Sequence, residues 1–503
     1  MRSAALRSRR IVLALVTVTA AGPAIAPAQE PTRLSTTAAT VADSLVGFHG
    51  RTQDAERTTL TIRERWGGSG DTATVEVGYL RLPARTASPG TPIVFLMGGP
   101  GVPGSVIGRV PPYWALFDRL RATADVIVLD PRGVGMSRPA LECAATSPPR
   151  ADFLASQQAL ADALVAAYAP CVAALRARGI RPELFSVAEV ARDVEAIRRR
   201  LGAGRVSLLG FSYGTRMALE YARLFPDHVD RVVLQGTMTP DDAIRTPTAM
   251  DSVLAAVSAA AARDSVARAL APELRASIAE LLRALDAAPV RVTVPGSRGD
   301  SVRLTVGRGG MQALLGGRLS DPRLPALVST LRAGDTRVLA MLAGGIYRDL
   351  AAGGGSLFGR TVYCSAPASE ARERLALRLA GASTLGEVFD NVPESPQFCR
   401  RIGITPGPRL APPAAPIHAA ALFITGTLDD RTPAANAQRA RSWFTDSKTV
   451  TVENGGHELL PDDAVQALVA AFFATGRVDR DRIVLPPWRF ASVAEALQPP
   501  RRR

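Results

Sequence analysis

One pentapeptide constrains the fold of this chain more than any other stretch: Gly-Phe-Ser-Tyr-Gly at residues 210–214. It follows a short apolar run at 206–209 and opens a stretch of helical character at 215–224. Strand, sharp turn and helix are the context of a nucleophile elbow, in which a strained turn exposes a serine hydroxyl at the end of a sheet. Glycine at both flanking positions avoids collisions that a Cβ atom would cause. A chance match is the alternative, but the strand–helix context favours Ser212 as a nucleophile.

The first residues have the composition of an export signal. Residues 7–10 are basic, residues 11–21 are apolar, and a small-x-small cleavage site ends at Ala28. The apolar core is too short for a membrane anchor and a Gly-Pro pair interrupts it, so we expect a cleaved signal peptide over residues 1–28. No later segment is expected to span a bilayer. The mature protein is therefore expected to be secreted or periplasmic, without stable membrane insertion.

The net charge of +14 does not indicate a nucleic-acid partner. The chain has no basic run with interleaved aromatic residues, and part of the charge comes from arginines in the leader and at the C-terminus. No Cys/His cluster has metal-ligand spacing, so we expect neither a metal nor a cofactor. The four cysteines of an exported chain are expected to be paired. Three connectivities are possible, and four free thiols are the alternative. The sequence-local pairs are Cys143–Cys171 and Cys364–Cys399, each worth ~3 kcal/mol.

Strand and helix patterns alternate through the first half of the chain. Residues 29–70 are polar with little pattern and are expected to wrap the surface. Residues 72–82 alternate apolar and polar, which predicts an antiparallel strand with one solvated face. A helix is expected over residues 188–201, and buried strands over 93–96, 125–129, 206–209 and 231–236. This alternation predicts an α/β fold whose mostly parallel sheet has helices on both faces.

A glycine-rich loop, Gly98-Gly99-Pro100-Gly101, follows the strand at 93–96. Its spacing does not fit a phosphate-binding loop. An acyl-transfer enzyme needs two backbone N–H groups where negative charge develops, and glycine lets the backbone approach the substrate. We expect one donor from Tyr213 and the other from Gly99, with Gly98 as the alternative. In the turn after the next strand, Asp130 and Arg132 are expected to brace their loop against this glycine loop.

The pattern changes after residue 240. Residues 241–410 are rich in Ala, Arg and Leu at helical spacing, with a possible hairpin at 290–305, and we expect an inserted helical lid. The glycines at 353–355 are interpreted as a loop. The catalytic domain would then comprise residues 29–240 and 411–503.

Strand pattern resumes at 419–425 and ends in a turn that contains Asp429 and Asp430. A second strand, 449–452, leads to His457. A serine hydroxyl needs an imidazole to take its proton and a carboxylate to orient that imidazole. The residues alone do not decide between Asp429 and Asp430.

His457 is the best candidate base among the four histidines. His49 precedes the sheet, His228 lies in a polar turn, and His418 enters a strand, where it is expected to be packed.

At these residues the chain resembles the exported tripeptidyl-aminopeptidase-like branch of the α/β-hydrolase serine peptidases, related to prolyl aminopeptidase. The resemblance spans residues 72–485, and its motifs lie at 98–101, 130–135, 210–215, 426–433 and 456–457. It implies the α/β-hydrolase fold, a TAP-like C-terminal region, and Asp429, the fourth residue of Gly-x-x-Asp, as the acid. Two departures concern substrate preference: Met97 stands where prolyl aminopeptidases usually have His, and no cysteine follows His457.

The resemblance implies an exported serine aminopeptidase that releases single residues, dipeptides or tripeptides from peptides with a free N-terminus. Ser212 would attack the carbonyl, His457 would move the proton, and Asp429 would orient the imidazole. An acidic lid residue would hold the substrate ammonium. An exported esterase with the same triad is the alternative, and a non-catalytic binding protein on this scaffold is a third hypothesis. The sequence does not indicate the oligomeric state.

Overall fold

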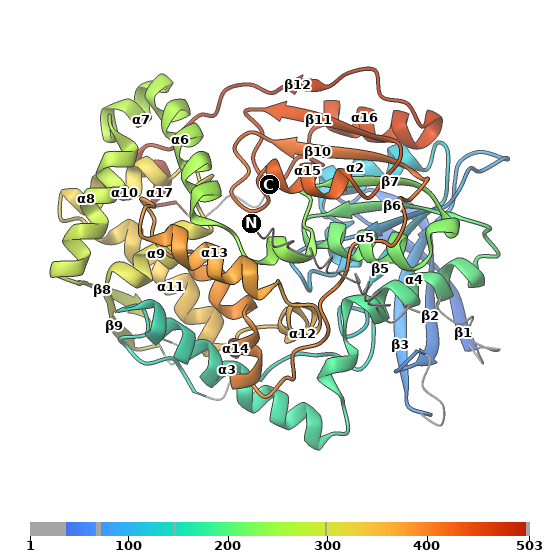
Figure 1. Cartoon of the computed structure of the whole chain (residues 1–503), viewed down its shortest axis with the longest axis horizontal. Coiled ribbons are helices and arrows are strands. Elements are labelled where there is room, and N and C mark those ends of the chain that lie inside the picture. Colours follow the sequence, from blue (N-terminus) through green and yellow to red (C-terminus); the bar gives the residue numbers. More distant parts are fainter. Residues whose placement is uncertain (1–36, 67–71, 145–146, 297–298, 499–503) are drawn as a thin grey trace, which may run out of the picture.

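The computed structural model describes residues 37–66, 72–144, 147–296 and 299–498, so the expected signal peptide at 1–28 lies outside the described residues. Its main feature is a 10-stranded sheet with the order β1-β2-β3-β5-β4-β6-β7-β10-β11-β12 (Figure 1). The strands are β1 (Thr37–Val46), β2 (Thr52–Arg63), β3 (Thr74–Leu82), β4 (Ile93–Leu96), β5 (Val126–Asp130), β6 (Val206–Phe211), β7 (Val229–Gln235), β10 (Ala420–Gly426), β11 (Ser447–Glu453) and β12 (Arg482–Val484).

The sheet is antiparallel from β1 to β5 and parallel from β5 to β12. Its central strands are fully buried, as expected for a parallel sheet covered on both faces. Strand β4 shows why: Ile93 and Phe95 pack into one hydrophobic cluster, and Val94 and Leu96 pack into another on the opposite face. The predicted α/β fold with helices on both faces is thus confirmed.

Helices α2 and α16 cover the first face, and α4 and α5 cover the second. The helices before β10 are α1 (Gly104–Ile107), α2 (Pro111–Leu120), α3 (Gln157–Ala177), α4 (Val187–Arg200), α5 (Tyr213–Leu224), α6 (Pro247–Arg263), α7 (Ser265–Leu270), α8 (Leu274–Ala287), α9 (Arg308–Gly316), α10 (Leu324–Arg332), α11 (Arg337–Ala351), α12 (Phe358–Ser365), α13 (Glu370–Ala380) and α14 (Pro396–Arg401). Those after it are α15 (Ala435–Arg441), α16 (Asp463–Thr475) and α17 (Val493–Ala496). The 3₁₀ helices are η1 (Pro182–Leu184), η2 (Pro226–His228), η3 (Pro240–Ala243) and η4 (Phe389–Glu394).

The segment between β7 and β10 is almost entirely helical and lies to one side of the sheet (Figure 1). It contains α6 to α14 and one hairpin, β8 (Val290–Pro295) with β9 (Ser301–Val306). Most of its buried apolar residues belong to one hydrophobic cluster, which also contains residues of α3 and of the C-terminal region. We call this segment the inserted segment.

Helix α3 is long and apolar enough to cross a membrane, by length and composition alone. This differs from the expectation that no segment after the signal peptide could span a bilayer. Its buried residues include Leu160 and Tyr168, which pack inside the protein, and Cys171 forms a disulfide. Helix α3 packs against helices α9 and α14 of the inserted segment.

Residues 29–70 were expected to have little pattern and to wrap the surface, but the part that the structure describes contains two regular strands, β1 and β2. Strands β1 and β2 pair along their whole length, from Thr37–Thr61 to Val46–Thr52. Alternate residues of β2 are buried, including Leu60 and Ile62, which is the alternation of a half-buried strand. Few of these residues are strongly apolar, so the periodicity is weak in the sequence. In β3, the expected solvated face is restricted to the first residues, since the residues from Val77 to Leu80 are all buried.

Candidate active site

The pentapeptide forms a tight turn between β6 and α5. Ser212 has φ 53° and ψ −123°, a strained conformation for a residue with a side chain. A Cβ atom on Gly214 would lie 1.9 Å from the carbonyl oxygen of Leu96, and one on Gly210 would lie 2.8 Å from the Cα of Thr215. Both glycines are therefore required by close backbone contacts with β4 and α5.

The structure brings the three predicted catalytic side chains together at the carboxyl ends of β6, β10 and β11. The Ser212 hydroxyl can donate a hydrogen bond to Nε2 of His457, at an Oγ–Nε2 distance of 2.9 Å. On the other side of the ring, Nδ1 lies 3.0 and 3.1 Å from the two carboxylate oxygens of Asp429. This is the arrangement in which an imidazole can remove the serine proton while the carboxylate orients the ring.

The carboxylate of Asp429 is held in place by its own loop. One oxygen accepts hydrogen bonds from the backbone N–H groups of Arg431 and Thr432, both at 2.8 Å, and the other accepts the Thr432 hydroxyl at 2.7 Å. Burial acts to raise the pKa of Asp429, but His457 and these hydrogen bonds outweigh burial, so the pKa lies below its usual range. Asp429 is therefore ionised when His457 accepts a proton. Sequence reasoning assigned no role to Thr432.

Residue Gln235, at the end of β7, positions the histidine loop and was not predicted. Its side-chain amide donates to the carbonyl oxygen of His457 at 2.9 Å. The imidazole ring packs against Phe211, with 5.1 Å between the ring centroids. The main chain and the ring of His457 are thus fixed separately.

The glycine loop lies directly against the elbow. A Cβ atom on Gly98 would lie 2.7 Å from the Cβ of Ser212, so only glycine permits this approach. Gly99 has φ +117° and lines the same cleft as Ser212. Tyr213 is the first residue of α5, where a backbone N–H group has no intrahelical acceptor. Gly99 and Tyr213 are thus both placed beside Ser212, as candidate oxyanion donors must be.

A cleft with a volume of about 900 Å³ extends from Ser212 and His457 to the inserted segment. From the inserted segment, residues of η4, α12 and the α9–α10 loop line it. Many lining residues are charged: Arg245, Arg318, Asp321, Arg323, Arg360, Glu394, Asp430, Arg431 and Glu458. This composition suits a polar, charged substrate.

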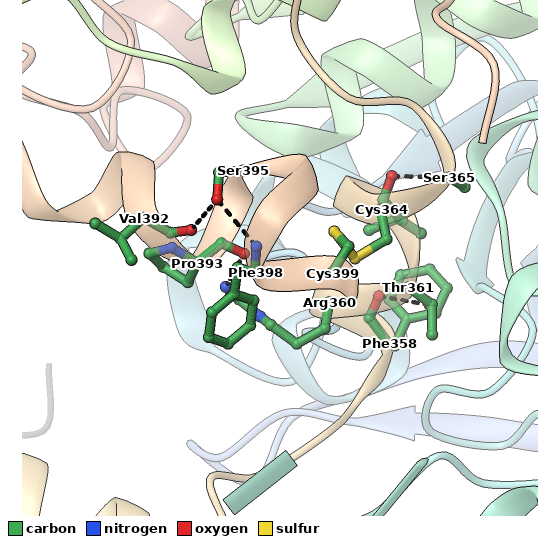
Figure 2. Close-up of a disulfide and its surroundings, with 11 residues drawn as sticks. Phe358, Arg360, Thr361, Cys364, Ser365, Val392, Pro393, Ser395, Phe398 and Cys399 are labelled. Atoms are coloured by element: carbon green, nitrogen blue, oxygen red, sulfur yellow. Dashed lines mark hydrogen bonds between the residues drawn. A yellow bond between two sulfur atoms is a disulfide. The ribbon is translucent and has the colours of Figure 1, made fainter. Parts of the chain in front are cut away.

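Both disulfides join the sequence-local pairs, Cys143–Cys171 and Cys364–Cys399. Figure 2 shows the second disulfide, which connects α12 to α14 beside η4. Arg360 of α12 donates a hydrogen bond to the carbonyl oxygen of Pro393 at 3.0 Å. Since Arg360 and Pro393 both line the cleft, the disulfide braces two adjoining parts of its wall.

The loop after β5 was expected to brace the glycine loop, and this holds for Asp130 alone. Its carboxylate accepts hydrogen bonds from the N–H and hydroxyl groups of Ser105, at 2.9 and 2.6 Å, in the helix that follows the glycine loop. Arg132 instead binds Asp193 of α4 through two hydrogen bonds of 2.6 and 2.7 Å. Sequence periodicity could not reveal this partner, since it requires the packing of α4 on the sheet.

The other candidate residues have partners away from the triad. The carboxylate of Asp430 binds Ser320 of the inserted segment. His228 lies 3.1 Å from a carboxylate oxygen of Glu195. His418 is exposed rather than packed, because it precedes β10 at the surface. Within the described residues, no group of three or more His, Cys, Asp or Glu side chains could hold a metal ion.

Comparison with known families gives two matches. The family described as "alpha/beta hydrolase fold" matches residues 91–286, which contain the glycine loop and Ser212. The family described as "TAP-like protein" matches residues 387–484, which contain Asp429 and His457.

Three similar proteins illustrate the relationship. The putative hydrolase YuaR of Escherichia coli K12 is 32% identical over 172 residues, covering 33% of this chain and 32% of that protein. The serine protease Hip1 of Mycobacterium tuberculosis H37Rv is 30% identical over 179 residues, covering 34% of each chain. The tripeptidyl aminopeptidase of Streptomyces lividans is 33% identical over 157 residues, covering 29% of this chain and 28% of that protein. The chain thus matches about a third of the length of each relative.

Proposed function

We propose that this chain, which has an α/β-hydrolase fold and matches the TAP-like family over residues 387–484, is a serine peptidase that removes short N-terminal fragments from peptides. The observation that carries the proposal is the continuous hydrogen-bonded path from Ser212 through His457 to Asp429. Relatives named as a serine protease and a tripeptidyl aminopeptidase support peptides as the substrate class.

The proposed reaction has two steps. Ser212 Oγ attacks the scissile carbonyl while His457 Nε2 takes the hydroxyl proton, and Asp429 stabilises the resulting imidazolium. The backbone N–H groups of Gly99 and Tyr213 would stabilise the oxyanion. His457 then donates the proton to the leaving amine, which leaves an acyl-enzyme. A water molecule, deprotonated by His457, releases the N-terminal fragment and restores Ser212.

We propose Glu394 as the acidic residue that holds the substrate ammonium. Two acids of the inserted segment line the cleft, Glu394 and Asp321. Asp321 is only half-buried. Glu394 is only 9% exposed, and a carboxylate with so little solvent interacts strongly with a cation in the cleft.

The test compares aminoacyl- and tripeptidyl-naphthylamides that have free or acetylated N-termini. A buried ion pair typically discriminates by about 100-fold, so we expect kcat/KM to fall by about that factor on acetylation. The variant Glu394→Gln should lose most of this preference, while Glu370→Gln, at an exposed acid of α13, should keep it. Equal turnover of free and blocked substrates would contradict the exopeptidase proposal. Ester hydrolysis without any amide cleavage would instead identify an esterase.

We also propose that the protein is exported. The composition of residues 1–28 supports this, and so do two disulfides, which persist in oxidising compartments. Expression in a bacterial host followed by cell fractionation and N-terminal sequencing tests the proposal. We expect a mature chain that begins near Gln29 outside the cytoplasm. A full-length cytoplasmic chain with reduced cysteines would contradict it.

A further inference from the structure

The residue next to the triad acid binds the inserted segment. Asp430 follows Asp429 directly, but its carboxylate accepts the hydroxyl of Ser320 at 2.6 Å and the backbone N–H group of Ser320 at 3.0 Å. Asp430 is 1% exposed. The two neighbouring aspartates therefore have different partners: Asp429 holds His457, and Asp430 holds a residue 110 positions earlier in the chain.

Ser320 belongs to the loop between α9 and α10, residues 317–323. This loop forms a large part of the cleft wall and contributes Gly317, Arg318, Ser320, Asp321, Pro322 and Arg323. A second contact supports the first: a Cβ atom on Gly317 would lie 3.1 Å from a guanidinium nitrogen of Arg431. Asp430 and Arg431 thus both lie against the same loop.

The chemistry of this contact makes it a firm connection. Hydrogen bonds to a charged carboxylate are about twice as strong as those between neutral groups. A buried carboxylate that loses its donors is left without compensation, so separating Asp430 from Ser320 is costly. The triad loop is itself fixed by the contacts of Asp429. The position of the α9–α10 loop is therefore coupled to that of the triad.

We propose that Asp430 is a positioning residue that fixes the α9–α10 loop as a wall of the cleft and so determines the binding of peptide substrates. This inference rests on the proposed function, because it assigns the wall to the recognition of peptide residues away from the scissile bond. A small ester needs only the end of the cleft that contains Ser212, His457 and the glycine loop. A tripeptide extends along the cleft to the wall that Asp430 and Ser320 hold.

The test measures two substrates in parallel, p-nitrophenyl acetate and a tripeptidyl p-nitroanilide with a free N-terminus. In Asp430→Asn and Ser320→Ala, we expect kcat/KM for the tripeptide to fall about tenfold more than for the ester, mainly through a higher KM. In the double variant, kcat/KM for the tripeptide should be no lower than in the more affected single variant, since the two substitutions remove the same contact. Asp335→Asn is the matched control: Asp335 also accepts a backbone N–H group in a loop of the inserted segment, away from the cleft, and should leave the ratio unchanged.

Hydrogen exchange provides a readout that does not depend on the substrate. Amides of residues 317–323 should exchange at least tenfold faster in Ser320→Ala and Asp430→Asn than in the wild type or Asp335→Asn. Equal losses for both substrates, or unchanged exchange in the loop, would overturn the inference. If the wild type cleaves only esters, the proposed function fails. The role of Asp430 would still be supported if the loop exchanges faster in the variants and if their kcat/KM falls more for long-chain esters than for acetyl esters.

Discussion

Nε2 of His457 lies 2.9 Å from Oγ of Ser212, although the two residues are 245 positions apart in the sequence. The contact forms because β6 and β11 belong to the parallel part of one sheet, where the strands end at the same edge. The whole inserted segment lies between the two residues in the chain without separating them in space. The sheet thus determines the positions of the reactive groups, and the inserted segment contributes a wall of the cleft.

Removal of the nucleophile should abolish turnover without affecting the fold. Ser212→Ala deletes one half-buried hydroxyl at the elbow, and we expect kcat to fall by about 10⁴-fold or more, because no other group can form the acyl-enzyme. The melting temperature should change by no more than a few degrees. Steady-state kinetics and thermal unfolding of the same preparation check both parts. A variant that unfolds would instead assign Ser212 a structural role.

Changing Asp429 to asparagine should lower turnover far more than the same change at its neighbour Asp430. Asp429→Asn removes the charge that orients His457, and loss of this group in a triad lowers kcat by about 10⁴-fold. Asp430→Asn should lower the turnover of p-nitrophenyl acetate much less, because the carboxylate of Asp430 does not contact His457. Comparable losses in the two variants would contradict the assignment of Asp429 as the acid.

The stability of the protein should depend on pH through Glu195. Burial acts to raise the pKa of this residue, but hydrogen bonds from Arg198 and Arg199 outweigh burial and lower the pKa to about 2. The folded state thus binds the proton more weakly than the unfolded state, so the stabilisation is present above the ordinary pKa of 4.5 and lost as the pH falls toward 2. Urea unfolding of Glu195→Gln and wild type should show a difference that is constant near neutral pH and shrinks below pH 4.5. A difference that grows in acid would contradict this account.

The two disulfides should stabilise the fold similarly but affect activity differently. They join cysteines 28 and 35 positions apart, so chain entropy assigns each about 3–4 kcal/mol. Replacing Cys364 and Cys399 with alanine should also raise KM for the tripeptide substrate several-fold, because α12 and η4 line the cleft. The Cys143–Cys171 pair, replaced in the same way, is the control and should affect stability alone. Equal changes in KM would contradict the bracing role of Cys364–Cys399.

Arg132 should contribute strongly to the stability of the fold because its charge is fully buried against Asp193. Removing one partner of a buried ion pair typically costs about 3–5 kcal/mol, since the other charge is left unpaired. We expect Arg132→Ala to lose about this much unfolding free energy in urea titrations. The double variant Arg132→Met/Asp193→Asn should recover part of the loss, because the buried charge of Asp193 is removed together with that of Arg132. A stable Arg132→Ala variant would contradict the assignment.

Local sequence patterns predicted the central sheet and the elements around Ser212 well. Buried strands such as β4 and β6 are continuous apolar runs, and the two glycines of the elbow are required by contacts with β4 and with α5 itself. The same patterns placed Ser212, His457 and the Asp429–Asp430 pair at strand ends, and the family resemblance then selected Asp429. These features depend on short segments whose pattern is visible without the fold.

Features that depend on distant partners could not be predicted in the same way. The hairpin of β1 and β2 contains few apolar residues, and its stability comes from pairing along ten positions and with β3. Nothing near Asp430 in the sequence indicates Ser320, which reaches it only through the packing of the inserted segment. The same applies to Glu394, whose place in the cleft depends on α12, α14 and the disulfide between them.

The central claim is that His457 and Asp429 activate Ser212 as a nucleophile, and labelling with a fluorophosphonate tests it most directly. Intact mass measurement and peptide mapping of the folded wild type should show one adduct per chain, on Ser212. The rate of labelling should fall by about 10³-fold or more in His457→Ala, because the hydroxyl then has no base. An unlabelled folded protein, an adduct on another residue, or equal rates in the wild type and His457→Ala would contradict the claim.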